Sequence, residues 1–421
     1  MLSEKLEDIA INIRSLGAKS DGTDSTQAFI KAREKSKYIF VPAGVYIIDS
    51  LVLQEVVLFG NGTLKWKGAS SSFMLELKGH CVIKGLTFDG NASLQKPINL
   101  PAIKITNANR TSIKDNNFNN FHSKIIVSDV ANSTNVQVLF NKFENCGTIS
   151  GCDVITVRSS DWTITGNSFR NIGAGHCVRL GLYDYDLPTH SVKRIIISEN
   201  YFRDTKHVGI TCEIYSQNIL ITKNIFESLH QAIKCESSRD KVYDITISDN
   251  IIRNIASKTS LNLSATKIKF INNRCYNLAG GPFFGKHFDC SHNEFYSSGS
   301  KNGGVISVQE HSSNAIVANN LIIKPRYRGI VLASGTITGN RIINCPDQAI
   351  RFSRSSLVVN NYIDGAKEGI VLVSSVSNSV ISNNILLNIS DTKISFSENN
   401  SFQSVLIKDN VGAEVDDLTL R

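Results

Sequence analysis

Two glutamates occupy the same place in two similar phrases, "GITCE" at residues 209–213 and "AIKCE" at residues 232–236. If these phrases are equivalent strands of successive repeats, Glu213 and Glu236 lie in one outward column. Two carboxylates one repeat apart repel each other, so one of them holds its proton to a higher pH. A protonated and an ionised carboxylate are what glycoside hydrolysis requires. We therefore predict a catalytic pair, and a surface charge ladder neutralised by nearby bases is the alternative.

Basic residues accompany this pair on neighbouring outward positions. Arg158, Arg179 and Lys234 would moderate the repulsion between the carboxylates or bind an acidic group of a substrate. Together with His207 and Tyr215 they are predicted to bind substrate.

A second pair of residues competes with the glutamates. The phrases "GCDVITV" at 151–157 and "GHCVRLG" at 175–181 lie one repeat apart, and Asp153 and His176 hold the same place at the start of each strand. A carboxylate and an imidazole are both used to transfer protons in catalysis. The sequence leaves two alternatives, a site centred on the glutamates or a site centred on Asp153 and His176.

The largest insertion between repeats is "GLYDYDLPTHS" at residues 181–191. It mixes aromatic rings with carboxylates, which suits the binding of sugar rings, and solenoids carry function on such loops. We predict Asp184 as a further catalytic residue and Tyr183, Tyr185 and Asp186 as substrate-binding residues. A solvated polar loop is the alternative.

The elements that would position these residues follow from a repeated six-residue phrase, for example "ITGNSF" at 164–169 and "ISENYF" at 197–202. The repeat averages about 24 residues, a period typical of solenoids. Its fourth letter is an asparagine, whose amide can donate to and accept from the asparagine of the next repeat. The predicted column consists of Asn117, Asn141, Asn167, Asn200, Asn224, Asn250, Asn273, Asn293, Asn320, Asn340, Asn361 and Asn384. We interpret it as scaffold.

Apolar residues alternate at spacing two within each repeat, which indicates short strands that place every second side chain inside. The predicted inward column of the last strand consists of Ile155, Val178, Ile210, Ile233 and Leu261. Several of the nine cysteines stand where other repeats have a core residue, as Cys290 does at the place of Ile164. We predict buried free thiols, with a disulfide or a reactive role as the alternative.

The amino-terminal region differs from the repeats. We expect residues 1–40 to form a strand and a capping helix, and residues 41–421 to form the solenoid with the inserted loop at 181–191. Asp24 or Ser25 is a plausible N-cap of the helix. A helix here would cover the first coil, whose exposed strand edges invite aggregation.

The segments "LGAKSDGTDSTQAF" and "VPAGVYII" in residues 16–48 resemble the amino-terminal signature of the pectate-lyase-like superfamily, in particular its bacteriophage tailspike and capsule-depolymerase members. The resemblance implies an all-β, right-handed, single-stranded parallel β-helix, of about 12 to 14 coils of three short strands. It also implies a homotrimer, and we interpret the apolar segment "SLVLQEVVLF" at 50–59 as an outer face that such an assembly would cover. Asp153 and His176 loosely resemble the Asp and Gly-His segments of polygalacturonase-type hydrolases, although Cys152 stands where a second Asp would be.

The predicted function is a phage tailspike-like depolymerase that hydrolyses a bacterial capsule or O-antigen. Alternatives on the same fold are a polysaccharide lyase, a uronate epimerase and a non-catalytic carbohydrate-binding adhesin. The expected partners are a bacterial surface polysaccharide and another phage tail protein, and the expected location is the virion or the extracellular space, without a general secretory signal peptide.

Composition excludes several other classes. The net charge of +8 is dispersed along the chain, without the basic arm that marks nucleic-acid tails. No run of 18 apolar residues is present, so membrane insertion is not expected. No phosphate-cradling glycine motif or calcium-loop spacing indicates a cofactor or a metal.

Overall fold

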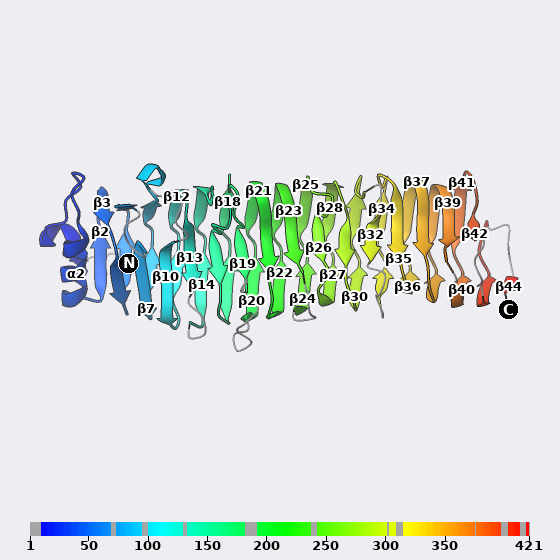
Figure 1. Cartoon of the computed structure of the whole chain (residues 1–421), viewed down its shortest axis with the longest axis horizontal. Helices are drawn as coiled ribbons and strands as arrows, with labels where there is room; N and C mark the ends of the chain where they lie inside the picture. Colours follow the sequence, from blue (N-terminus) through cyan, green and yellow to red (C-terminus); the bar gives the residue numbers. More distant parts are fainter. Residues whose placement is uncertain are drawn as a thin grey trace, which may run out of the picture. The chain divides into compact units, whose positions relative to one another are not determined.

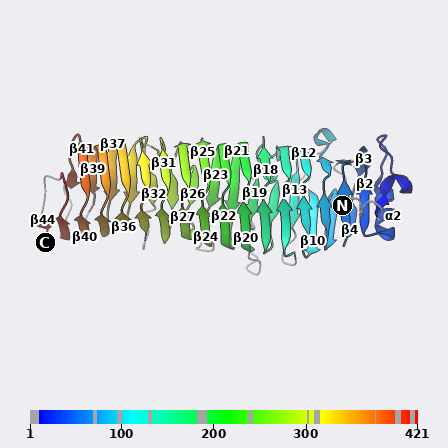
Figure 2. The same cartoon turned by 180° about the vertical axis from the view of Figure 1, so that it is seen from behind.

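The computed structural model describes residues 10–68, 73–94, 100–128, 133–181, 192–236, 242–300, 303–308, 315–374, 376–396, 403–412 and 418–420. The chain divides into two compact units, an N-terminal unit of residues 1–220 and a C-terminal unit of residues 221–421. In each unit, parallel strands stack coil upon coil in chain order (Figures 1 and 2). None of the described helices is long and apolar enough to cross a membrane.

The strands form two sheets, here named sheet A and sheet B. Sheet A of the N-terminal unit contains β1 (Ile11–Asn12), β2 (Tyr38–Val41), β5 (Val57–Gly60), β8 (Val82–Lys84), β11 (Ser112–Lys114), β14 (Val136–Leu139), β17 (Trp162–Thr165) and β20 (Val192–Ser198). Strand β22 (Ser216–Thr222) of sheet A includes the boundary between the units. Sheet A of the C-terminal unit contains β24 (Tyr243–Ser248), β27 (Thr266–Ile271), β30 (Phe288–Ser291), β33 (Ile316–Ala318), β36 (Gly335–Thr338), β38 (Ser356–Val359), β40 (Ser377–Ser382), β43 (Gln403–Lys408) and β44 (Leu418–Leu420).

Sheet B contains the other two strands of each coil. Its N-terminal strands are β3 (Val45–Ile48), β4 (Leu51–Gln54), β6 (Thr63–Trp66), β7 (Leu75–Gly79), β9 (Thr87–Asp89), β10 (Pro101–Ala108), β12 (Asn117–Phe121), β13 (Lys124–Ser128), β15 (Lys142–Cys146), β16 (Ile155–Val157), β18 (Ser168–Arg170), β19 (Val178–Leu180) and β21 (Tyr201–Cys212). Its C-terminal strands are β23 (Ile225–Cys235), β25 (Ile251–Ile255), β26 (Leu261–Leu263), β28 (Arg274–Leu278), β29 (Pro282–Phe284), β31 (Glu294–Tyr296), β32 (Gly304–Val308), β34 (Leu321–Ile323), β35 (Arg328–Leu332), β37 (Arg341–Phe352), β39 (Tyr362–Leu372), β41 (Ile385–Ile389) and β42 (Ile394–Phe396).

One coil therefore consists of one strand of sheet A followed by two strands of sheet B, as β17, β18 and β19 show. In some coils the last two strands run on as one, as in β21. The chain contains about 15 coils, slightly more than the 12 to 14 predicted. The parallel β-helix and its three strands per coil are confirmed.

The predicted inward column is also confirmed. Ile155 pairs with Val178 and Val178 with Ile210, while Ile233 pairs with Leu261 in the C-terminal unit, and all five side chains are fully buried. All nine cysteines are free and buried, as predicted for core residues.

The asparagines of each unit form a hydrogen-bonded ladder. Each Nδ2 donates to the Oδ1 of the asparagine one coil later, at 2.9 to 3.1 Å. The ladder starts at Asn116, so the prediction of Asn117 was wrong by one residue. Asn117 is exposed and begins β12, because the apolar ring that follows the asparagine by two residues is Phe118 in this coil and Phe169 in the coil of Asn167. The ladder extends to Asn410.

Helix α2 (Thr26–Lys35) lies beside the first coil and buries Ala28, Phe29 and Ala32 (Figure 1). Ser25 is the N-cap residue, but its side chain makes no capping bond. Instead the Asp24 carboxylate accepts from the Thr26 amide at 2.9 Å. Short 3-10 turns occur at η1 (Ile13–Leu16) and η2 (Ala92–Leu94).

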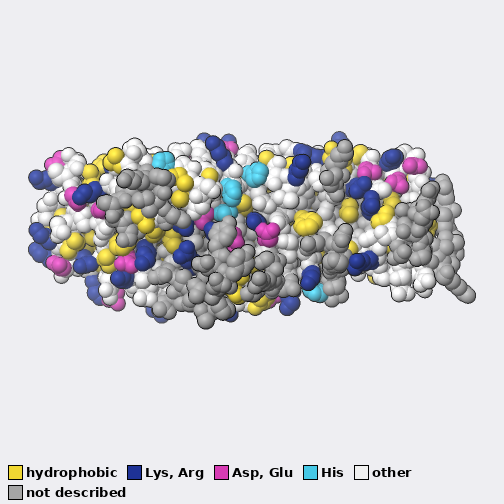
Figure 3. All heavy atoms as spheres, in the orientation of Figure 1, with side chains coloured by type: hydrophobic (Ala, Val, Ile, Leu, Met, Phe, Trp, Pro, Cys, Tyr) yellow, Lys and Arg dark blue, Asp and Glu magenta, His cyan; other side chains and the backbone are white. Residues whose placement is uncertain are grey.

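The segment "SLVLQEVVLF" at 50–59 was interpreted as an apolar outer face, and this was wrong for most of it. Leu51, Leu53 and Leu58 take inward positions of β4 and β5, and Val56 lies between the two strands. All four side chains are inside the solenoid, at most 1% exposed. The segment therefore does not support a trimer. On the face drawn in Figure 3, basic and acidic side chains are interspersed, with no block of a single sign.

Candidate functional site

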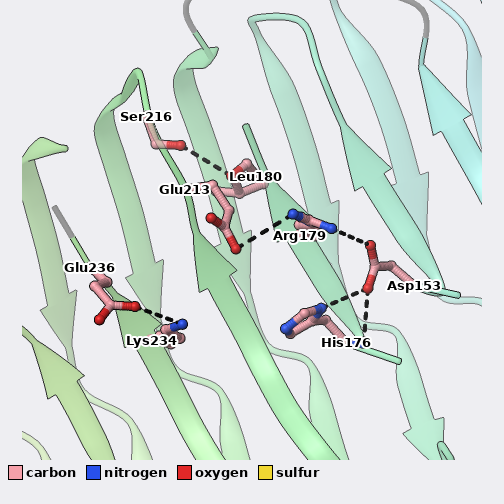
Figure 4. Close-up of polar contacts among 8 residues, drawn as sticks. All are labelled: Asp153, His176, Arg179, Leu180, Glu213, Ser216, Lys234 and Glu236. Atoms are coloured by element: carbon pink, nitrogen blue, oxygen red, sulfur yellow. Dashed lines mark hydrogen bonds and ion pairs between the residues drawn. The ribbon is translucent and has the colours of Figure 1, made fainter. Parts of the chain in front are cut away.

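A group of four polar side chains lies on or directly beside the last strand of three successive coils in the N-terminal unit. Asp153 and His176 each stand two residues before a member of the inward column, Ile155 and Val178, which pair with each other. Arg179 is in β19, and Glu213 directly follows β21. We call Asp153, His176, Arg179 and Glu213 the N-terminal network (Figure 4).

Asp153 is the centre of the network and has no exposed surface. Its Oδ1 accepts hydrogen bonds from the His176 backbone amide at 3.1 Å and from the His176 ring at Nδ1, at 2.6 Å. Its Oδ2 accepts from Nη1 of Arg179 at 3.3 Å. Asp153 therefore fixes both the ring of His176 and the guanidinium of Arg179.

Arg179 joins two carboxylates. Its Nη1 bonds Asp153, and its Nη2 lies 3.6 Å from Oε1 of Glu213. The Arg179 side chain is 7% exposed, whereas that of Glu213 is 18% exposed. The network thus runs from a carboxylate without solvent contact to one that solvent reaches.

The pKa of Asp153 reflects this environment. Burial raises the pKa, but the hydrogen bond and charge of His176 and the charge of Arg179 outweigh it, so the pKa lies below its ordinary value. Asp153 is ionised at neutral pH and holds its partners as a carboxylate.

Lys124 belongs to the same surroundings and was not predicted from the sequence. It stands two residues before Ile126, which pairs with Ile155, so Lys124, Asp153 and His176 hold equivalent places on three coils. Burial lowers the pKa of Lys124; the charge of Asp153 opposes this, and those of Arg158 and Arg179 add to it. The position two residues before the inward column is the signal that could have found it.

His207 lies against His176, with ring centroids 4.6 Å apart and planes at 74°. The predicted substrate-binding residues Arg158, Arg179 and His207 are thus close to Asp153, His176 or Lys124. Two further side chains flank Arg179 in its column, Thr156 and Thr211. Their buried hydroxyls have no hydrogen-bond partner among the described residues. Such groups are costly to bury.

The two sequence-predicted constellations are partly joined. Glu213, from the first, lies in one network with Asp153 and His176, from the second. Glu236 belongs to the C-terminal unit and pairs with Lys234 at 2.7 Å (Figure 4). The pairing of Glu213 with Glu236 stays a prediction.

The remaining predicted residues have other positions. Tyr215 lies in the turn before β22, has a φ of 67° and accepts a bond from the Val192 amide at its carbonyl. Tyr183, Asp184, Tyr185 and Asp186 lie outside the described residues.

Comparisons with known proteins concern mainly the fold. A family model described as "Periplasmic copper-binding protein (NosD)" matches residues 238–411. No curated protein matches this chain. The surface protein and adhesin PfbA of Streptococcus pneumoniae is 16% identical in a solved structure, with 92% of this chain and 99% of that chain covered and a TM-score of 0.52.

A family 28 exopolygalacturonase of Yersinia enterocolitica is 14% identical, with 97% of this chain and 78% of that chain covered and a TM-score of 0.54. Tailspike protein 3 of bacteriophage CBA120 is 13% identical, covering 99% of this chain and 63% of that chain, but its TM-score of 0.41 is too low to support a conclusion. The chain has the right-handed parallel β-helix fold.

The described residues of the matched region do not fit a copper site. Its cysteines, Cys275, Cys290 and Cys345, are buried, and burial raises the pKa of each thiol, that of Cys345 to about 11. Copper binds the thiolate form. Among the described residues, no three His, Cys, Asp or Glu side chains are gathered as metal ligands.

Proposed function

We propose that this chain binds an acidic bacterial surface polysaccharide and hydrolyses its glycosidic bonds at the N-terminal network. The observation that supports this most is the position of Arg179 between a buried and a partly exposed carboxylate, beside an oriented imidazole. Such a network holds charged groups in place before a substrate arrives, which is the main requirement for electrostatic catalysis.

Each residue has a separate role in the proposed reaction. Asp153 is a positioning residue, because no solvent reaches it. Its bond to Nδ1 of His176 leaves Nε2 as the ring nitrogen that exchanges a proton with the substrate. Arg179 attracts an acidic group of the sugar and keeps Glu213 in position.

Two proton transfers accompany hydrolysis. The doubly protonated ring of His176 donates its Nε2 proton to the glycosidic oxygen as the bond from the anomeric carbon to that oxygen breaks, and it regains a proton from Glu213 through solvent after the reaction. Glu213 accepts a proton from the water that forms the new bond to the anomeric carbon. Glu236 is the alternative second carboxylate, as predicted from the sequence.

Purified capsules and O-antigens incubated with the wild-type chain test this proposal. We expect new reducing ends and shortened oligosaccharides by mass spectrometry from at least one acidic polymer. Glu213→Gln should abolish the release of reducing ends, and Glu144→Gln is its matched control. Glu144 also pairs with an arginine one coil away, Arg170 at 3.9 Å, but lies outside the network. Products that absorb near 235 nm would indicate a lyase, and binding without cleavage of any polymer would indicate an adhesin and overturn the proposal.

We also propose, from the amino-terminal signature, that the protein is part of a phage tail, docks onto another tail protein and forms a homotrimer. Light scattering at working concentration measures the mass directly. A monomer mass would overturn the trimer and weaken the phage assignment.

A further inference from the structure

A second polar network lies in the C-terminal unit, on the last strands of three successive coils. It consists of Arg328 in β35, Gln348 and Arg351 in β37, and Glu368 in β39. Ile330, Ile350 and Ile370 pair in register beneath them and are fully buried. We call these four residues the C-terminal network.

The side chains of this network contact one another across the coils. Nη1 of Arg351 donates to Oε1 of Gln348 at 3.3 Å, and Nε2 of Gln348 donates to Oε2 of Glu368 at 2.7 Å. The Ser395 hydroxyl donates to the other Glu368 oxygen at 3.3 Å. Arg328 binds Asp347 through Nε at 3.1 Å. All four members are partly exposed, so a ligand can reach them.

The two networks occupy equivalent places of the repeat. Arg328, Gln348 and Glu368 stand two residues before the inward isoleucines of their coils, as Asp153 and His176 do before Ile155 and Val178. Arg351 directly follows its inward isoleucine, as Arg179 directly follows Val178. The same strand therefore carries the same kind of polar group in both units. The C-terminal network was not predicted from the sequence.

Arg351 is the member of the C-terminal network that favours an anionic ligand. It forms no ion pair with any described residue, whereas the second guanidinium of the network, that of Arg328, pairs with Asp347. Burial and the charge of Arg328 lower the pKa of Arg351, and the charges of Asp347 and Glu368 oppose them. Two neighbouring guanidiniums repel each other, and a carboxylate bound between them relieves that repulsion and accepts planar hydrogen bonds.

We propose that the C-terminal network is a second carbohydrate site, which binds the carboxylate of a uronic acid residue through Arg351 and Arg328. Gln348 and Glu368 accept hydrogen bonds from the neighbouring sugar hydroxyls. The site rests on the proposed function in its ligand class, because it holds the same acidic polysaccharide without cleaving it.

Titration calorimetry on the full chain tests the site, with hexamers of galacturonate and of mannuronate as probes and a neutral glucose hexamer as control. The background is Glu213→Gln, which removes cleavage. We expect at least one uronate hexamer to bind, and Arg351→Gln to weaken it about tenfold and to reduce its salt dependence. Arg354→Gln, which removes an exposed charge three residues further on, leaves the affinity unchanged.

A change of opposite sign separates binding from stability. Glu368→Gln removes a negative charge next to the two guanidiniums and is expected to tighten binding of the uronate hexamer about two- to fivefold. A purely structural network would instead lower the melting temperature in both variants without moving either affinity. That result, or failure of both uronate hexamers to bind, would overturn the site.

Cleavage by the wild type is scored separately. In an active enzyme Arg351→Gln raises KM and leaves kcat unchanged. Binding that depends on Arg351 without any cleavage would overturn the proposed hydrolysis and keep the second site. Cleavage with an unchanged KM in Arg351→Gln would keep the proposed hydrolysis and overturn the second site.

Discussion

The N-terminal and C-terminal networks hold equivalent places on the coil but differ in burial. Asp153 has no exposed surface and Arg179 is 6% exposed, whereas the side chains of Arg328 and Asp347 in the C-terminal unit are 25% and 36% exposed. In the first network a buried carboxylate binds both the imidazole and the guanidinium. In the second, a neutral amide stands in the middle and links a guanidinium to a carboxylate.

This difference separates two uses of one scaffold. A buried, ionised carboxylate cannot exchange its hydrogen-bond partners for water. It therefore holds those partners in one geometry, which suits catalysis. A half-exposed network keeps its groups hydrated and can trade water for a ligand, which suits reversible binding. Burial of the central group, more than the type of the surrounding residues, distinguishes the two proposed functions.

The largest expected effect is on turnover. Glu213→Gln keeps the shape of the side chain but removes its proton transfer, so turnover should fall on the order of 10² to 10⁴ while folding and polysaccharide binding persist. Glu368→Gln, at the C-terminal network, should leave turnover near normal. Reducing-end assays on both variants and on Glu236→Gln measure this. Near-normal turnover in both Glu213→Gln and Glu236→Gln would exclude either glutamate as the proton acceptor and leave His176, held by Asp153, as the proposed proton-transfer group.

The next effect is on stability. Asp153→Asn leaves the buried Arg179 guanidinium with only its 3.6 Å contact to the Glu213 carboxylate, which should cost about 3 to 5 kcal/mol in the free energy of unfolding. Asp161→Asn removes a partner of Arg194 in an ion pair whose arginine is 61% exposed, and should cost about 1 kcal/mol or less. Urea unfolding of both variants makes the comparison. Equal costs would show that burial does not distinguish the N-terminal network.

The asparagine ladder gives an intermediate effect that belongs to neither network. The Asn224 side chain has no exposed surface. Its Nδ2 donates to the Thr222 carbonyl at 3.0 Å and to Oδ1 of Asn250 at 3.1 Å. Asn224→Ala should cost about 1 to 3 kcal/mol and leave turnover per folded molecule unchanged. A variant that kept its melting temperature but lost activity would contradict the scaffold role.

A change in pH dependence is expected at the N-terminal network. Because the folded pKa of Asp153 lies below its ordinary value of 3.8, its contribution is fully present above that value and is lost as pH falls through the folded pKa. Stability of the wild type should therefore decline more steeply below pH 3.8 than that of Asp153→Asn. Thermal unfolding from pH 5 down to pH 2 measures both slopes, and parallel curves would count against an ionised Asp153.

The smallest effect is expected from Arg328→Gln. Its ion pair with Asp347 is half-exposed, so unfolding should change by about 1 kcal/mol or less. A cost as large as that of Asp153→Asn would mean that the C-terminal network is also structural.

The sequence predicted the periodic part of the structure well. Inward positions recur at every second residue within a strand and once per coil between strands, as Ile155 and Val178 do. Because stacking requires these positions to be apolar, the residue types alone identify them. The slip at Asn117 has a local cause, since Asn116 and Asn117 stand together and only the following Phe118 sets the register.

The sites were less predictable because a repeated position can carry a charged side chain in one coil and an uncharged one in the next. Lys124 and the C-terminal network hold the same places as Asp153 and Arg179, but their contacts depend on side-chain reach and on burial, which the repeat does not encode. The apolar segment at 50–59 misled for a related reason, since apolar letters do not say which face of a strand is inside.

The asparagine ladder also bears on how such a protein can change over generations. Successive ladder asparagines are 20 residues apart at Asn273 and Asn293 and 33 apart at Asn167 and Asn200, yet the amide bonds are 3.1 and 3.0 Å long. The length of this hydrogen bond thus does not depend on the number of loop residues in each coil. Duplication or deletion of one whole coil returns the amides to the same alignment, so a lineage can lengthen, shorten or decorate this solenoid stepwise without rebuilding its interior.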